Sequence, residues 1–203
     1  MPEGFVVADI IAISGHRLYY DRAALFQGID QLKARTYLFG GAQGIDTDAL
    51  EYIAKTQPYS LRTVIVPNRL VDQPKLTIPI TKKYSTSVIE LGKTDPGRYM
   101  NRNRYLVNHS NHLRAFYDFR KSGGTYNTIE YARNTGRPLS ITPMIEQDLN
   151  KYTVYTEKEM WEFMNTTQAN QVPLSHVKVI ITGYFKQRVG YIPADVVVRL
   201  RSW

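Results

Sequence analysis

Three glycine-rich turns hold the residues whose types and spacing are best suited to binding an anion. They are Ser14-Gly15-His16-Arg17, Gly40-Gly41-Ala42-Gln43-Gly44-Ile45-Asp46 and Ser122-Gly123-Gly124-Thr125. Glycine lets the backbone approach a ligand closely, and a helix that follows the turn directs unpaired N–H groups and its positive dipole end at the same place. One such turn is ordinary loop chemistry, whereas three at one sheet edge indicate a nucleotide-binding site. The first turn lacks the G-x-G-x-x-G spacing, and the sequence contains no P-loop motif.

Basic residues are concentrated around the third turn. The chain of 203 residues has 26 Lys and Arg against 18 Asp and Glu, which gives a formal net charge of +8. Residues 98–137 contain eight basic and two acidic residues, a local net charge of +6. Such an excess favours anionic partners, namely nucleotides or nucleic acid. Within this segment Arg102 and Asn103 fall on an expected helix.

The elements that position these turns alternate between strands and helices. A β-branched apolar run predicts a buried strand at 6–13, and further strands are predicted at 36–39, 63–66, 113–119 and 138–143. Helical spacing predicts a first helix capped by Asp21 that reaches Leu32, a second after Asp46, a third at 98–108, and a fourth that ends before Gly136. Residues 87–91 fit either a short strand or a helix. This alternation predicts an α/β fold with a Rossmann-like, doubly wound, mainly parallel sheet.

The regular alternation of predicted strands and helices ends at Met144. We expect residues 1–145 to form the nucleotide-binding domain and residues 146–203 to form a small C-terminal extension of unknown role. In the extension we predict a helix at 158–164 and strands at 177–181 and 196–198. The extension is too short for a confident core of its own, so we expect it to pack on the main domain or on a partner subunit of a homo-oligomer.

Composition excludes several classes of protein. No apolar run reaches the roughly 18 residues of a membrane span, and no secretory leader is evident, so we expect a soluble, cytoplasmic protein. The chain has no cysteine, which excludes disulfides and thiol catalysis. Its four histidines show no metal-ligand spacing, and we expect no metal. Neither Ser14 nor Ser122 has an evident His/Asp partner for nucleophilic catalysis.

Taken in order, these motifs resemble those of the SLOG superfamily, named for the DNA-processing protein Smf/DprA and the LOG phosphoribohydrolases. The likeness covers about residues 10–143 and is strongest to the YspA/YpsA-like branch of bacteria and their phages. It rests on the three turns, the Arg102-Asn103 pair, and the sequence Ile129-Glu130-Tyr131-Ala132 after the third turn. It implies a Rossmann-like fold that binds a nucleotide or a nucleotide-derived ligand.

By position, the resemblance implies a ligand site built from all three turns and the Arg-Asn pair. The implied residues are Ser14, Gly15, Arg17, Gly40, Gly41, Gly44, Asp46, Arg102, Asn103, Ser122, Gly123, Gly124 and Thr125. Asp46 is either a ribose-binding residue or an N-cap or first-turn acid of the second helix. Thr125 binds phosphate or is only an N-cap. Tyr99 and Tyr126 flank the expected site.

The third turn departs from the hydrolase pattern of the LOG enzymes, which place a glutamate three residues after the threonine. Here that position is Thr128, and Glu130 lies two residues further on. Two residues rotate a side chain by about 200° around a helix, so Glu130 either acts as a poorly aimed catalytic acid or pairs with Arg133 on the surface. Whether the chain is an enzyme therefore stays open.

Three functions remain. The first is a protein that senses or sequesters a phosphorylated, ribose-containing ligand such as a nucleotide or an ADP-ribose-like molecule. The second is a hydrolase that cleaves the N-glycosidic bond of a nucleotide. The third is a DprA-like protein that binds single-stranded nucleic acid through residues 98–137.

Overall fold

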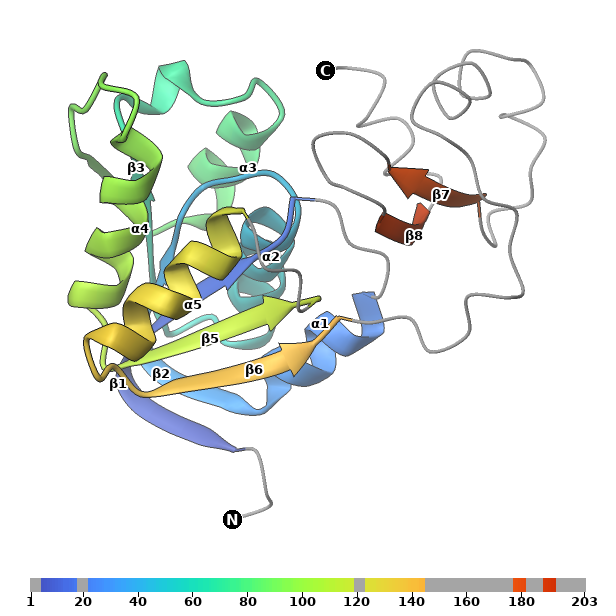
Figure 1. The fold of residues 1–203 in the computed structure, drawn as a ribbon. Helices are drawn as coiled ribbons and strands as arrows, with labels where there is room; N and C mark the ends of the chain where they lie inside the picture. Colours follow the sequence, from blue (N-terminus) through green and yellow to red (C-terminus); the bar gives the residue numbers. More distant parts are fainter. Residues whose placement is uncertain (1–4, 18–21, 119–122, 145–176, 182–187, 193–203) are drawn as a thin grey trace. The chain divides into compact units, whose positions relative to one another are not determined.

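A computed structural model describes residues 5–17, 22–118, 123–144, 177–181 and 188–192. The chain divides into two units, and the larger one holds a sheet of six parallel strands (Figure 1). These strands are β1 Val6–Gly15, β2 Leu32–Phe39, β3 Leu61–Val66, β4 Ser87–Glu90, β5 His112–Tyr117 and β6 Leu139–Pro143. Their order across the sheet is β4-β3-β2-β1-β5-β6. The predicted α/β, Rossmann-like class is confirmed.

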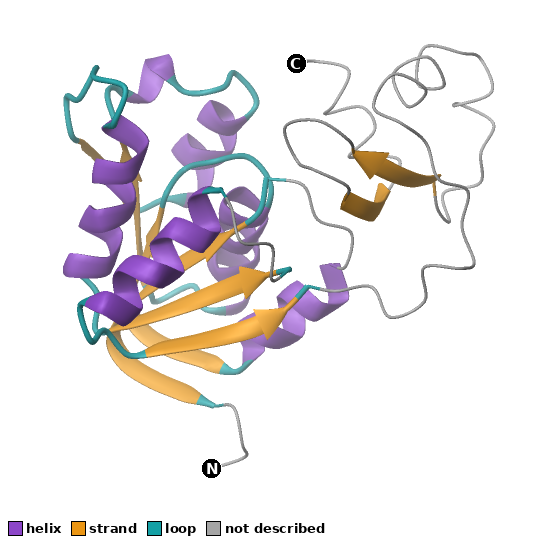
Figure 2. Cartoon of the chain, viewed as in Figure 1, coloured by secondary structure: helices purple, strands orange, loops and turns teal. Residues whose placement is uncertain are grey.

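Five α-helices connect the strands. They are α1 Arg22–Asp30, α2 Ile45–Thr56, α3 Thr77–Tyr84, α4 Arg98–Asn108 and α5 Gly124–Asn134, with a short 3-10 helix, η1, at Leu70–Asp72. Helices α4 and α5 lie side by side over one face of the sheet (Figure 2). Helices α1 and α2 pack against the other face, where Gly28 of α1 lies against Phe116 and Ile45 of α2 lies against Gly15. None of the helices in the described segments is long and apolar enough to span a bilayer.

Apolar side chains explain why the sheet is covered on both faces. On the α4/α5 face the core is formed by Ala12, Leu38, Ile65, Leu106, Val107, Leu113 and Ala132. On the opposite face β1 contributes Ile11 and Ile13, which are fully buried. A strand that is buried on both faces reads as a continuous apolar run, which is what residues 10–13 show.

The direction in which strands are added reverses between β1 and β5. From β1 the chain builds β2, β3 and β4 on one side, and it then crosses back to place β5 and β6 on the other. Ligands of open α/β sheets bind outside the carboxyl ends of the strands at such a switch point. The carboxyl ends of β1 and β5 are Gly15 and Tyr117.

Several expected boundaries need correction. Leu32 does not belong to the first helix but begins β2, because α1 ends at Asp30. Helix α3 and η1 lie between the predicted strand 63–66 and residue 87, where no element was predicted, and residues 87–90, which fitted either a strand or a helix, form the strand β4. Gly136 follows the end of α5 with φ 65°, as predicted for a C′ glycine.

The smaller unit contributes two antiparallel strands, β7 Val177–Ile181 and β8 Arg188–Ile192. Strand β7 was predicted, whereas β8 was not. The helix expected at 158–164 and the strand expected at 196–198 lie outside the described residues, and the proposed boundary near residue 145 stays a prediction.

Candidate functional site

Arg102 lies against the end of strand β2, where Gly40 leaves room for it. A Cβ atom on Gly40 would lie 2.6 Å from Cζ of Arg102 and 2.8 Å from Oδ2 of Asp46. The two charged side chains thus meet over the same glycine, and they are only 7% and 6% exposed. Burial lowers the pKa of Arg102 and raises that of Asp46, while the charge of each group opposes the shift of the other.

The hydrogen bonds of Arg102 connect it to the start of α5. Its Nε donates to Oδ1 of Asn103 at 2.8 Å, and Nδ2 of Asn103 donates to the carbonyl of Gly124 at 3.3 Å. Within the described ranges, the terminal nitrogens of this buried guanidinium make no hydrogen bond to the protein. They therefore offer a planar set of donors that suits a phosphate or a carboxylate.

The N-termini of α2 and α5 differ in charge. The first turn of α2 contains Asp46 and Asp48, whereas the first turn of α5 contains no acidic residue. Oδ2 of Asp46 accepts the N–H of Ala42 at 3.2 Å. The positive end of the α2 dipole is therefore compensated by the protein's own carboxylates. The N-terminus of α5, beside Arg102, has no such compensation from its first turn and is electrostatically suited to a ligand anion.

The structure gives the helix positions of Asp46 and Thr125, for which the sequence left two roles open each. Asp46 is a first-turn acid of α2, and the N-cap is Gly44. Thr125 is not an N-cap, because Gly123 holds that position with φ 92°. Thr125 lies in the first turn of α5 and is 5% exposed. Whether either residue also contacts a ligand stays a prediction.

The first and second glycine turns touch through their backbones. The N–H of Ile45 donates to the carbonyl of His16 at 3.1 Å. A Cβ on Gly15 would lie 2.6 Å from Cβ of Ile45, and one on Gly44 would lie 2.7 Å from the carbonyl oxygen of His16 and would also collide with the carbonyl of Arg17. This contact keeps the exposed Arg17 close enough for its charge to act on Asp46 and Arg102.

Substituting Gly44 tests this contact. Gly44→Ala is expected to lower the free energy of unfolding by about 2 kcal/mol, since a side chain there is strained by the backbone conformation and collides with the first turn. Gly44 has φ 89°. Gly136→Ala is the matched control, because Gly136 has φ 65° but nothing within 4 Å of the added Cβ, so about 1 kcal/mol is expected. If urea unfolding showed the same loss in the free energy of unfolding for Gly44→Ala and Gly136→Ala, the contact between the two turns would not contribute to stability.

A histidine–aspartate pair at the switch point was missed by the sequence analysis. Nε2 of His16 lies 2.8 Å from Oδ1 of Asp118, with the side chains 7% and 11% exposed. The His16 ring also stacks on Tyr117 at 5.7 Å between ring centroids. The available signal was that His16 lies in the glycine turn after the first predicted strand and Asp118 lies near the end of the predicted strand 113–119, at the same sheet edge. In the described part of the chain, no hydrogen bond joins Ser14 to His16.

The remaining predicted residues are placed as follows. Gly41 has φ 67°, and a Cβ on it would lie 2.9 Å from Val64, so it shapes the turn on the β3 side. Gly123 and Gly124 begin α5, and Ser122 lies outside the described residues. Tyr99 is 42% exposed and stacks with Arg98. Among the described residues no three His, Asp or Glu side chains group in a way that could hold a metal ion.

Glu130 forms an ion pair with Arg133 at the surface of α5. Nη1 of Arg133 donates to its Oε1 at 2.7 Å, which confirms the predicted surface pair. Glu130→Gln is therefore expected to change nucleotide affinity less than about twofold and stability by no more than about 0.5 kcal/mol. Titration calorimetry and thermal unfolding measure both quantities, and a tenfold loss of affinity would return Glu130 to the site.

Comparison with known proteins yields one informative likeness. No protein-family model matches the sequence, and no curated protein matches it. A solved structure of DNA processing protein A from Helicobacter pylori, described for its mode of binding single-stranded DNA, is similar with a TM-score of 0.52. The sequences are 18% identical, and the match covers 70% of this chain and 67% of that one. The described domain therefore shares its fold with DNA processing protein A.

Proposed function

We propose that this protein binds a phosphorylated, ribose-containing ligand, a nucleotide or an ADP-ribose-like molecule, and thereby senses or sequesters it. The observation that carries the proposal is the buried guanidinium of Arg102, whose terminal nitrogens have no hydrogen-bond partner in the described chain and which is tied through Asn103 to the N-terminus of α5. Burying such a charge costs several kcal/mol unless it is compensated, and a ligand phosphate would supply the compensation.

The charges around the site support the same proposal. Arg102 and Arg17 face one carboxylate, Asp46, which leaves one unit of positive charge. The dipole of α5 adds a further partial positive charge at the same place. The resemblance to the YspA/YpsA-like branch of the SLOG superfamily stays a prediction, and it agrees with a nucleotide-type ligand.

Native mass spectrometry of the purified protein tests the proposal directly. We expect a co-purified ligand whose mass fits a phosphorylated nucleoside, and binding of AMP or ADP-ribose by calorimetry once it is removed. Purified protein without a bound ligand that takes up no member of a panel of nucleoside mono- and diphosphates, NAD and ADP-ribose would contradict the proposal.

Binding of single-stranded nucleic acid is a second candidate, because it is the described property of the similar structure and because arginines stack on aromatic rings outside the site. Arg98 lies 4.9 Å from the ring centroid of Tyr99, and Arg104 lies 5.5 Å from that of Tyr131. Such pairs provide positive charge and stacking surface together.

A salt series separates the two candidates. We expect the affinity for a nucleotide to change little between about 50 and 200 mM salt, whereas an oligonucleotide that releases several counterions would lose about 1000-fold or more. Filter binding of a labelled oligothymidylate and calorimetry with AMP give the two slopes. A steep slope for the oligonucleotide that becomes shallower in Arg104→Ala would favour the nucleic-acid candidate.

A further inference from the structure

The residues around the carboxyl ends of β1, β2 and β5 are linked in one continuous chain of contacts. Gly124 is bonded to Asn103, whose neighbour Arg102 meets Asp46 over Gly40. Two residues before Asp46, Gly44 lies against the carbonyls of the first turn, and there His16 is paired with Asp118. The contacts therefore lead from the start of α5 to the end of β5.

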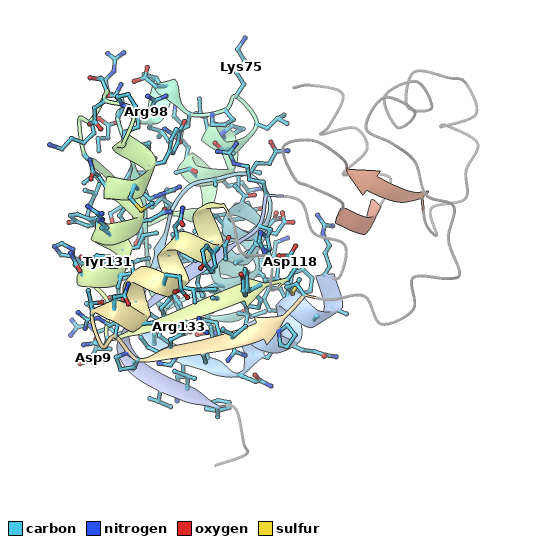
Figure 3. All side chains as sticks on the ribbon, viewed as in Figure 1. Asp9, Lys75, Arg98, Asp118, Tyr131 and Arg133 are labelled. Atoms are coloured by element: carbon cyan, nitrogen blue, oxygen red, sulfur yellow. The ribbon has the colours of Figure 1, made fainter. Side chains whose placement is uncertain are left out.

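The His16–Asp118 pair lies on the same face of the sheet as Arg102. Along β1, Ala12 belongs to the core cluster under α4 and α5, and Ser14 and His16 follow it at the two-residue period of a strand. The ring of His16 stacks on Tyr117, which packs with Ile129 of α5. Figure 3 shows Asp118 at the carboxyl end of β5, with Asp9 at the opposite end of the sheet.

We propose that Asp118 is the carboxylate that recognises the ribose of the ligand and that His16 is the residue that positions it. This inference rests on the proposed nucleotide function. The Asp46 carboxylate accepts the N–H of Ala42 in its own turn and interacts with the charge of Arg102, so it is the poorer candidate for sugar hydroxyls. A carboxylate has about four acceptor positions, so ligand hydroxyls can bind Asp118 in addition to the contacts that it makes within the protein, of which the contact with His16 is one.

The position of Asp118 along the chain favours the sugar over the base. Asp118 directly follows β5, and Gly123, the N-cap of α5, comes five residues later, so both belong to the side of the switch point at which the phosphate is proposed to lie. The group next to a 5′-phosphate in a nucleotide is the ribose, whose 2′- and 3′-hydroxyls are a pair of donors. A carboxylate that only accepts hydrogen bonds is complementary to such a pair.

His16 would act by holding the carboxylate in place. Nε2 of His16 lies 2.8 Å from Oδ1 of Asp118 and 3.3 Å from the backbone nitrogen of the same residue. The contact to Oδ1 is a hydrogen bond when Nε2 carries the proton, and together with the stacking of the ring on Tyr117 it restricts the rotation of the Asp118 side chain. A preorganised acceptor loses less entropy when a hydroxyl binds.

Comparing AMP with 2′-deoxy-AMP measures this role. A site built to bind a hydroxyl rejects an analogue without it, because its acceptor is left unpaired in a partly buried place. We expect the protein to bind AMP at least about tenfold more tightly than 2′-deoxy-AMP, the low end for a hydrogen bond to a charged group. Asp118→Asn should reduce this ratio to about one to threefold, and His16→Gln should reduce it part of the way.

Two controls keep a general loss of structure apart from a loss of recognition. Asp9→Asn makes the same change at the exposed, opposite end of β1 and should leave the ratio at its original value. Affinity for inorganic phosphate, which has no sugar, should stay within about twofold in Asp118→Asn because α5 and Arg102 are untouched.

The outcomes separate this inference from the proposed function. Equal binding of AMP and 2′-deoxy-AMP by the unmodified protein, or a ratio that Asp118→Asn leaves unchanged, would overturn the role of Asp118 while nucleotide binding stands. A ratio that His16→Gln leaves unchanged would overturn the positioning role of His16 alone. Failure of both nucleotides and of phosphate to bind would overturn the proposed function and this inference with it.

Discussion

Arg102→Ala is expected to weaken nucleotide binding by about 1.5 to 3 kcal/mol, roughly 10- to 150-fold, which is the range for hydrogen bonds to a charged group. Arg102 is 7% exposed, and its guanidinium makes one hydrogen bond in the described chain, to Asn103, so its terminal donors are the part that a ligand would use. Arg102→Lys should recover only part of the loss, because an ammonium group cannot supply the planar pair of donors. Titration calorimetry with AMP gives all three affinities.

Arg104→Ala is the matched control for charge. Arg104 lies on the same helix two residues later, is exposed, and stacks on Tyr131. Its removal lowers the net charge equally but should change AMP affinity by less than about twofold, since exposed charges are screened. If Arg102→Ala and Arg104→Ala weakened binding to the same extent, Arg102 would act only through the overall charge of the protein.

Arg102→Ala also affects Asp46. The positive charge of Arg102 opposes the rise in the pKa of the buried Asp46 carboxyl, so its loss should raise that pKa further. A higher folded-state pKa means that folding favours the protonated acid, and stability should then fall as pH rises above the unfolded value of about 4. We therefore expect Arg102→Ala to be less stable relative to the unmodified protein at pH 8 than at pH 5, as measured by urea unfolding.

The sheet could be predicted from the sequence because its signals are local. β-Branched apolar runs indicated β1 and β3, an apolar and aromatic run indicated β5, and helix α4 was predicted with the bounds that the structure shows. The glycine-rich turns that follow three strands indicated the edge of the sheet at which a ligand can approach the backbone. Leu32 was assigned to a helix because it fits helical spacing, but its pairing with Val6 across two strands decides its structure.

The parts of the site that could not be predicted depend on pairings between distant residues. His16 and Asp118 are 102 residues apart, and nothing in either local sequence indicates the other. The difference between the N-termini of α2 and α5 is visible in the sequence as acids at 46 and 48, but its meaning depends on where Arg102 lies. Residues 68–97 gave no pattern because α3 has only two buried side chains, Thr77 and Thr81, and neither is apolar.

Gly124→Val should abolish nucleotide binding, a loss of more than about 100-fold, while the protein stays folded. Gly124 is the first residue of α5, where an anion would approach the backbone N–H groups. Branched methyl groups there would occupy the space in which the phosphate is proposed to lie. The fold can accept the change, because a Cβ at this position meets only Nδ2 of Asn103, at 3.6 Å, and Gly124 does not require a positive φ. Gly123 is a poorer choice, since its φ of 92° would strain any side chain.

Asn127→Val is the matched control for this substitution. It places the same β-branched side chain on an exposed position of α5, three residues further along the helix. Valine and asparagine have helix propensities within a few tenths of a kcal/mol of each other, so the free energy of unfolding should change little. Calorimetry with AMP and thermal unfolding of both variants complete the test. Because the two variants carry valine on the same helix, a folded Gly124→Val protein that binds AMP as tightly as Asn127→Val would show that the phosphate does not lie at the start of α5.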